Sequence, residues 1–195
     1  MRFSKQERQD LFIAWVLISV AFTIALRQTS VSLLENFLIS IATVGVGFIA
    51  HELAHKYVAQ HYNKSAEFKA SISMLLLSVV IAFSGIVIAA PGAVVISGFV
   101  SQRQSGLISA AGPATNIVLA LLFLPVFLAA NNPFLLVLAS FGFLVNAWLA
   151  LFNLIPFWVF DGAKIIAWNK TIYAILVTTS LLLVFLGAAF VMPGV

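Results

Sequence analysis

Long apolar runs dominate this sequence, and short stretches rich in charged residues, Gly, Pro or Asn separate them. Each run is close to the roughly 20 residues that an α-helix needs to cross a bilayer, although the first run is shorter. The pattern predicts an all-α polytopic membrane protein, built as a bundle of about six transmembrane or re-entrant helical segments. The runs occupy residues 11–26, 37–60, 72–90, 107–130, 134–155 and 172–192.

The composition supports this assignment. Hydrophobic residues make up 63% of the 195 residues and charged residues only 8%. Soluble proteins usually contain about 25% charged residues, so this chain has too few polar groups to cover a surface that faces water. We therefore expect one membrane-embedded domain over residues 1–195, with its core at 37–170 and with no soluble domain. The lipid bilayer is then the first partner of the chain.

The net charge of +4 comes from 10 Lys and Arg residues against 6 Asp and Glu residues. The basic residues lie between the apolar runs, where they determine membrane topology, so we expect no nucleic-acid partner. The sequence contains no Cys, which excludes disulfides, thiolate metal ligands and a Cys nucleophile.

The distribution of basic residues favours five crossings and one re-entrant segment. If all six runs cross the membrane, six basic residues lie on one side and four on the other, which is almost no bias. If residues 72–90 instead enter the bilayer and return, nine basic residues lie on one side and Arg27 alone on the other. Because basic residues concentrate in cytoplasmic loops, we predict a multi-pass protein of the cell membrane with a cytoplasmic N-terminus.

The second apolar run contains the sequence His-Glu-Leu-Ala-His at positions 51–55. On a helix, His51 and His55 lie one turn apart on the same face, so two imidazoles can bind one metal ion, and Glu52 can reach a water molecule beside it. Ionisable groups at membrane depth are costly and mark function. The motif therefore predicts a site for one Zn²⁺ ion. The alternative is a buried polar cluster that ties helices together.

A catalytic zinc ion usually has three protein ligands and an open position for water, so a third ligand is needed. His61 has a spacing found in some zinc motifs, but Val58 stands where those motifs require Gly, and a continuing helix carries His61 about 9 Å along its axis. Glu67 lies in a basic loop at 64–69, where a surface ion pair accounts for it. Asp161 is the remaining candidate.

Asp161 lies in an apolar stretch that has no basic residue until Lys164. A carboxylate in such surroundings has to be paired, protonated or bound to a metal ion. Pro156 interrupts the fifth run, and Gly162 permits a tight turn after the acid, so we expect a loop that directs Asp161 toward the bundle. The alternative is an ion pair between Asp161 and Lys164 at the membrane interface.

Two further motifs accompany these residues. The sequence Asn-Leu-Ile-Pro at 153–156 precedes Asp-Gly at 161–162, and Gly-Pro-Ala-Thr-Asn stands at 112–116. Together with the His-Glu-Leu-Ala-His motif, they resemble the site-2 protease family of intramembrane zinc metalloproteases, in a minimal prokaryotic form. The resemblance covers residues 37–170.

The resemblance implies roles for individual residues. It makes His51, His55 and Asp161 the zinc ligands, and it makes Glu52 the catalytic acid/base. It also implies that Asn153 helps to hold the substrate or its oxyanion, where one such donor can contribute roughly 3 kcal/mol. A helix-capping or helix–helix hydrogen bond is the alternative role for Asn153.

The chain also departs from the family pattern. Phe160 stands before the Asp-Gly pair, where the family commonly has Leu, and the run at 72–90 is not part of the shared three-helix core. The PDZ and CBS domains of some members are absent. Asn116, in the Gly-Pro motif, is a weaker candidate for substrate contact, because the Gly-Pro start most simply lets a helix approach the His-Glu-Leu-Ala-His helix, with Asn116 bonding across the contact.

The implied activity is hydrolysis of a peptide bond within or near a transmembrane helix of a membrane protein substrate, at an active site toward the cytoplasm. Residues 91–98 are rich in β-branched side chains and are bounded by Gly and Pro, which predicts a short membrane-associated β element. We expect Val94, Val95 and Ile96 to present an edge to which an unwound substrate adds as a strand. The alternative is a connecting loop.

Two other functions can use the same residues. A zinc or proton transporter also places His and acidic residues inside the membrane, but transporters usually consist of two related halves, and this sequence has no such symmetry. A catalytically inactive membrane scaffold is disfavoured because Glu52 and all three proposed ligands are present.

Overall fold

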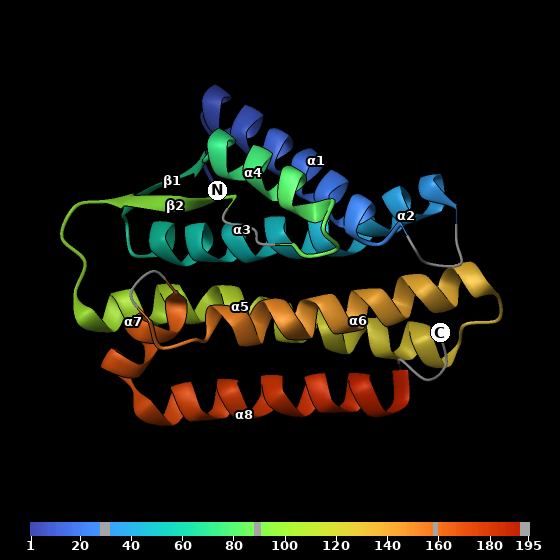
Figure 1. Cartoon of the computed structure of the whole chain (residues 1–195). Coiled ribbons are helices and arrows are strands. Elements are labelled where there is room, and N and C mark those ends of the chain that lie inside the picture. The colour runs from blue at the N-terminus through green and yellow to red at the C-terminus, as the bar shows by residue number, and fades with distance from the viewer. Residues whose placement is uncertain (28–31, 88–90, 158–159, 192–195) are drawn as a thin grey trace.

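The computed structural model describes residues 1–27, 32–87, 91–157 and 160–191, and Figure 1 shows their arrangement. Among these residues, five helices are long and apolar enough to cross a membrane. The predicted all-α membrane bundle is therefore confirmed. These helices are Lys5–Ala25 (α1), Leu33–His61, Gln102–Leu128 (α5), Pro133–Asn153 (α6) and Lys170–Ala189, which contains α8 at Lys170–Leu186 and the start of a π turn at Gly187–Val191.

Several helices begin before the apolar runs that predict them, because polar residues cap their first turns. Ser4 accepts a hydrogen bond from the backbone N–H of Glu7, so α1 starts at Lys5 rather than at residue 11. Ser101 caps α5 in the same way through Gln104. A capping side chain of this kind satisfies an N–H that has no partner within the helix. The end of the last predicted run, residue 192, lies outside the described residues.

The second crossing consists of three consecutive pieces. Helix α2 (Leu33–Ser40) leads through a π turn at Ile41–Gly45 into α3 (Val46–His61), which carries the His-Glu-Leu-Ala-His motif. The indole N–H of Trp15 on α1 donates to the carbonyl of Ile41, 3.2 Å away, at the start of that turn. This contact anchors α1 to the second crossing.

The third apolar run forms a short helix, α4 (Ile72–Ala82). Its 11 residues rise about 16 Å, which is too short for a hydrocarbon core about 30 Å thick. Strands β1 (Ser65–Ala70) and β2 (Gly92–Ser97) flank this segment and pair antiparallel, with Ala70 opposite Gly92. The chain therefore returns to the end of the bundle that it left, in agreement with the predicted re-entrant segment. Residues 88–90 lie outside the described residues.

The β element predicted at 91–98 is present as β2, but the expectation of a loop at 64–69 is wrong. Those residues form most of β1, in which Glu67 pairs with Val95, and the Glu67 carboxylate accepts a hydrogen bond from the Ser4 hydroxyl. Phe68 is buried on one face of β1, and charged side chains occupy the other face. This strand is short and its outward face carries charged side chains. Its alternation of apolar and polar residues therefore resembles the sequence of a polar loop.

The two edges of this sheet have different surroundings. On the outer edge of β1, the backbone N–H groups of Phe68 and Ala70 donate to Glu7 (2.9 Å) and Asp10 (3.0 Å) of α1. Opposite residues of an antiparallel pair point their N–H groups either toward each other or both away. Val94 and Gly92, which face Phe68 and Ala70, therefore point their N–H groups away from β1. No third strand covers this edge of β2 among the described residues.

The remaining helices hold the bundle together. Figure 1 shows α5 and α6 in a layer between α3 and α8, with β1, β2 and the short helix α7 (Asp161–Trp168) at one end. Small residues such as Ala120 and Ala147 let α5 and α6 approach closely around the buried ring of Phe143. The end of the bundle that carries α7 and the sheet also carries the candidate site.

Candidate metal centre

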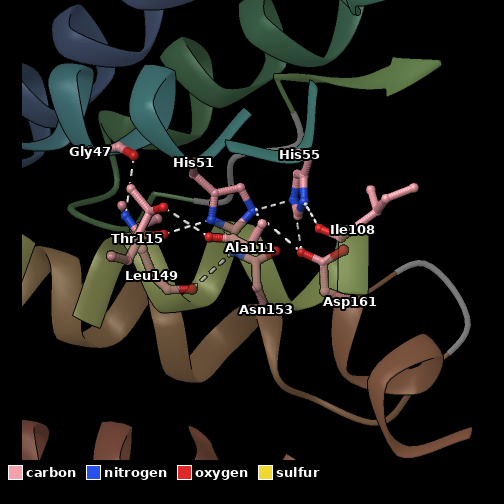
Figure 2. A network of polar contacts seen from close by, with 10 residues as sticks. Gly47, His51, His55, Ile108, Ala111, Thr115, Leu149, Asn153 and Asp161 are labelled. Carbon is pink, nitrogen blue, oxygen red and sulfur yellow. Dashed lines mark hydrogen bonds and ion pairs between the residues drawn. The ribbon is translucent and has the colours of Figure 1, made fainter. Parts of the chain in front are cut away.

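Three side chains predicted as metal ligands converge at this end of the bundle (Figure 2). His51 and His55 lie one turn apart on α3, and Asp161 is the first residue of α7. Their ligand atoms form a small triangle: the two Nε2 atoms lie 3.0 Å apart, and Oδ2 of Asp161 lies 3.3 Å from Nε2 of His51 and 3.1 Å from Nε2 of His55. All three residues are buried.

The size of this triangle fits a zinc ion. With bonds of about 2.0–2.1 Å, two ligands of a tetrahedral zinc ion lie about 3.3 Å apart. The three separations of 3.0, 3.3 and 3.1 Å are close to this value. Two imidazole nitrogens and one carboxylate oxygen also match the ligand set of a catalytic zinc site, in which a fourth position remains open. The residues present therefore fit the ion.

The chain directs Asp161 into the site through a close contact between α6 and α7. Helix α6 ends at Asn153, and α7 begins eight residues later. A Cβ atom on Gly162 would collide with the backbone carbonyl of Leu154 and would lie 2.7 Å from the carbonyl oxygen of Ile155. The expected tight turn at Gly162 is wrong: this residue is helical, and Gly is needed for the close approach. Residues 158–159 of this connection lie outside the described residues.

Asp161 lies outside the membrane-crossing helices, and its surroundings favour the ionised form. Burial of the carboxyl opposes ionisation. The charge on His55 and the hydrogen bonds from both imidazoles outweigh burial and hold the pKa of Asp161 well below its usual range. A carboxylate has to be deprotonated to bind a metal ion, so Asp161 is in the required form. No ion pair between Asp161 and Lys164 is present among the described residues.

Helix α5 supports both imidazoles from behind. Nδ1 of His55 lies 2.7 Å from the carbonyl oxygen of Ile108, and Nδ1 of His51 lies 2.6 Å from Oδ1 of Asn116. Gly112 permits this proximity, because a Cβ atom there would lie 2.5 Å from the Nε2 atoms of both histidines. The close approach expected from the Gly-Pro motif is present.

Glu52 lies beside the triangle and is 8% exposed. Its carboxylate accepts a hydrogen bond from the backbone of Val94 on β2. Within the described part of the chain, its Oε2 atom is buried and has no hydrogen-bond partner. A buried carboxylate oxygen without a partner can accept a proton or a hydrogen bond from a molecule that enters the site.

A cavity of about 370 Å³ gives access to these groups. Glu52 and the three ligand residues line it together with Val94 and Ile96 of β2, whereas Val95 does not line it. Asn153 also lines the cavity, with its side-chain N–H donating to the carbonyl of Leu149, 2.9 Å away. The cavity therefore contains metal-ligand atoms, a carboxylate and one side of β2.

The other candidate residues lie elsewhere. His61 ends α3 with an exposed side chain whose ring contacts Tyr62. Glu67 is on β1, and neither residue belongs to the ligand cluster found among the described residues. Asn116 is completely buried behind His51 and does not line the cavity.

Sequence reasoning missed two contributors to this site. Asn146 hydrogen-bonds to Asn116 from α6, and a polar residue within an apolar run was an available signal for it. The carbonyl of Ile108 supports His55, and nothing in the sequence marks a particular backbone carbonyl for such a role.

Comparison with known proteins identifies a relative. The chain is 38% identical over 177 residues to a protein of Methanocaldococcus jannaschii that is named a putative zinc metalloprotease, and the match covers 89% of this chain and 90% of that protein. No family model matches the chain, and no solved structure matches it. The ligand triangle, the adjacent Glu52 and this similarity agree. The chain belongs to the zinc metalloprotease family of that archaeal protein.

Proposed function

We propose that this protein is an intramembrane metalloprotease of the site-2 type, which hydrolyses a peptide bond within or near a transmembrane helix of a membrane protein substrate, as in regulated intramembrane proteolysis. The observation that carries the proposal is the buried triangle of His51, His55 and Asp161 beside Glu52, in a bundle of apolar helices. A soluble metalloprotease has no need of such a bundle.

The chemistry assigns a role to each residue. His51, His55 and Asp161 would hold one zinc ion, which supplies a Lewis acid that activates water and polarises a carbonyl when it is bound. Glu52 takes a proton from the attacking water and delivers it to the leaving amine, because Glu52 lines the same cavity and its Oε2 atom has no hydrogen-bond partner among the described residues. Asn153 lines the cavity and is the side-chain donor proposed for the oxyanion.

The orientation follows from charge. Arg2, Lys56 and Lys164 lie on the N-terminal side of α1, near the end of α3 and on α7, and these elements share the end of the bundle that carries the sheet (Figure 1). Nine of the ten basic residues belong to the segments at this end, and Arg27 follows α1 at the other end. By the positive-inside rule this end faces the cytoplasm, so water and the substrate reach the site from that side.

The edge of β2 that faces away from β1 offers a place for the substrate. A transmembrane helix hides its peptide bonds within its own hydrogen bonds, so it has to unwind before hydrolysis. Carboxylates of α1 occupy the outer edge of β1. On the opposite edge of the sheet, the backbone of Val94 donates to Glu52, and Val94 and Ile96 line the cavity. A substrate segment that adds to β2 as a strand satisfies its own backbone and passes directly over Glu52 and the ligand triangle.

Substitution of Glu52 by Gln tests the proposal. Purified protein in liposomes is combined with a panel of single-span membrane proteins, and zinc content and cleavage are both measured. We expect E52Q to retain zinc and to lose cleavage, because Gln cannot take the proton. E67Q, which alters a carboxylate on β1 outside the cavity, is the matched control and should cleave normally.

The same liposomes distinguish a transporter from a protease. A zinc or proton transporter would change the ion content of the vesicles and yield no peptide product. Zinc flux without cleavage by the wild-type protein would overturn the proposal, as would equal cleavage by E52Q and the wild type. A protein that holds zinc but cuts no member of the panel would favour the inactive scaffold.

A further inference from the structure

A chain of buried side-chain amides connects His51 to helix α6. Oδ1 of Asn116 lies 2.6 Å from Nδ1 of His51, and Nδ2 of Asn116 donates to Oδ1 of Asn146 at 2.9 Å. Nδ2 of Asn116 also donates to the carbonyl of Gly47 at 3.1 Å, and Nδ2 of Asn146 donates to the carbonyl of Gly142 at 2.9 Å. Both asparagines are completely buried. Figure 2 shows part of this network around Gly47 and His51.

The backbone carbonyls of Gly47 and Gly142 accept hydrogen bonds from the two asparagines and thereby fix the direction of each hydrogen bond in this chain of amides. A carbonyl oxygen only accepts, so Gly142 fixes which atom of the Asn146 amide is the nitrogen, and its oxygen must face Asn116. The Asn146 oxygen and the Gly47 carbonyl are both acceptors, so the Asn116 atom that faces them must be the amide nitrogen. The oxygen of Asn116 is therefore the atom that faces His51, and an oxygen acceptor requires a proton on Nδ1 of the imidazole.

We propose that Asn116 is a positioning residue for the metal site, and that Asn146 acts through it. Asn116 holds a proton of His51 on Nδ1, so that Nε2, the atom that faces Asp161 and His55, is left to bind the metal ion. This inference rests on the proposed metal centre. The carbonyl of Ile108 does the same for His55, but a backbone carbonyl cannot be lost by substitution, whereas a side-chain amide can.

A second role for the same amides is to hold α3, α5 and α6 together, and the two roles predict different results. Positioning of His51 depends on the oxygen of Asn116, and attachment of the helices depends on its nitrogen. Asp at position 116 keeps an oxygen acceptor and lacks the two N–H donors. Leu at this position lacks both the acceptor and the donors. Substitution of a residue that hydrogen-bonds to a metal-binding histidine typically lowers metal affinity about 10–100-fold.

The test compares N116L and N116D in detergent by competition with a zinc chelator and by thermal unfolding. We expect zinc affinity to fall about 10–100-fold in N116L and to stay within about threefold of the wild type in N116D. Both variants should lose thermal stability. T115V is the matched control, because the Thr115 hydroxyl bonds to the carbonyl of Ala111 within α5 and should not affect zinc affinity.

Asn146 provides an independent variant. N146L removes the oxygen that orients Asn116, so zinc affinity should fall, and the double variant N116L/N146L should bind zinc no more weakly than N116L. Full additivity of the two losses would overturn the role of Asn146. Wild-type affinity in N116L, or equal loss in N116L and N116D, would overturn the role of Asn116.

A measurement on the metal-free protein separates this inference from the metal site itself. Nitrogen-15 NMR of the imidazoles should show a proton on Nδ1 of His51 in the wild type and partial loss of that proton in N116L, with His55 unchanged in both. Absence of a proton on Nδ1 of His51 in the wild type would overturn the inference whether or not zinc binds. Failure of the wild type to bind zinc would instead overturn the proposed function.

Discussion

Lys56 and Glu7 form an ion pair that is almost completely buried, with side-chain exposures of 1% and 0%. Lys56 is the residue after His55 on α3, and Glu7 belongs to the first turns of α1. The second oxygen of Glu7 accepts the backbone N–H of Phe68 on β1, 2.9 Å away. One carboxylate thus joins α1, the ligand-bearing helix and the outer strand of the sheet.

We predict that K56M destabilises the protein by about 3–5 kcal/mol, because it leaves Glu7 as a buried charge without its partner. Thermal or denaturant unfolding in detergent measures the loss. K69M is the control, since Lys69 is exposed on β1 and its substitution should have little effect. Equal stabilities of K56M and K69M would show that Glu7 is not held as a buried charge.

Removal of any one metal ligand should abolish zinc binding. His51→Ala, His55→Ala and Asp161→Ala each leave two ligands of a site that requires three, so elemental analysis of the purified variants should find little zinc, and cleavage should be lost. His61→Ala changes the same type of residue on the same helix but outside the cluster, and it should keep its zinc. Zinc loss in the His61 variant as well would indicate a general failure to fold rather than loss of a ligand.

Gly112 limits how large a residue can be beside the two imidazoles. In G112A the new Cβ atom would lie 2.5 Å from both Nε2 atoms, so either the imidazoles or α5 must move. A displacement near 1 Å at a reacting centre can cost about 100-fold in rate, and we expect a loss of that order in cleavage together with weaker zinc binding. The folded state should survive, because Ala favours a helix more than Gly does. Normal zinc affinity in G112A would contradict the geometry of the site.

The parts of this structure that sequence alone predicts are those in which the residue type has few alternatives. His51, Glu52 and His55 are costly at membrane depth, and their spacing on a helix permits one metal ion. Asp161 could be selected because a third ligand was required and the other candidates had simpler roles. The five helices that are long and apolar enough to cross a membrane are predicted by the length of the apolar runs and the distribution of basic residues.

The parts that sequence could not predict depend on tertiary contacts. Strand β1 has only six residues, and its stabilisation comes from β2 and from the carboxylates of α1 rather than from its own pattern. The third run is apolar over 72–90, but its helix ends at Ala82, and no local signal separates a short buried helix from a crossing one. Gly is needed at position 162 because the backbone of Leu154, just after the end of α6, lies against it. This contact exists only in the folded protein.

The two edges of β2 lead to a prediction about the substrate. Val95 lies opposite Glu67, and its backbone N–H points toward β1. The backbone N–H of the next residue, Ile96, points away from β1, on the side of the cavity. Proline removes the backbone N–H at either position. At Ile96, where the N–H points away from β1, this breaks no hydrogen bond between the strands. V95P should therefore destabilise the sheet, whereas I96P should leave it paired and remove a donor that is available to an added strand.

We expect I96P to retain zinc and lose cleavage by about tenfold or more, because a net hydrogen bond contributes about 0.5–1.5 kcal/mol and Pro also restricts the backbone that the substrate has to match. I96A is the control: it removes a side chain that packs against the buried cluster of Ala59, Ala66 and Ile108, but it keeps the N–H. Cleavage of a membrane-spanning substrate and zinc content are measured for both variants. If I96A is impaired as strongly as I96P, the side chain rather than the strand edge is required, and addition of the substrate to β2 is ruled out.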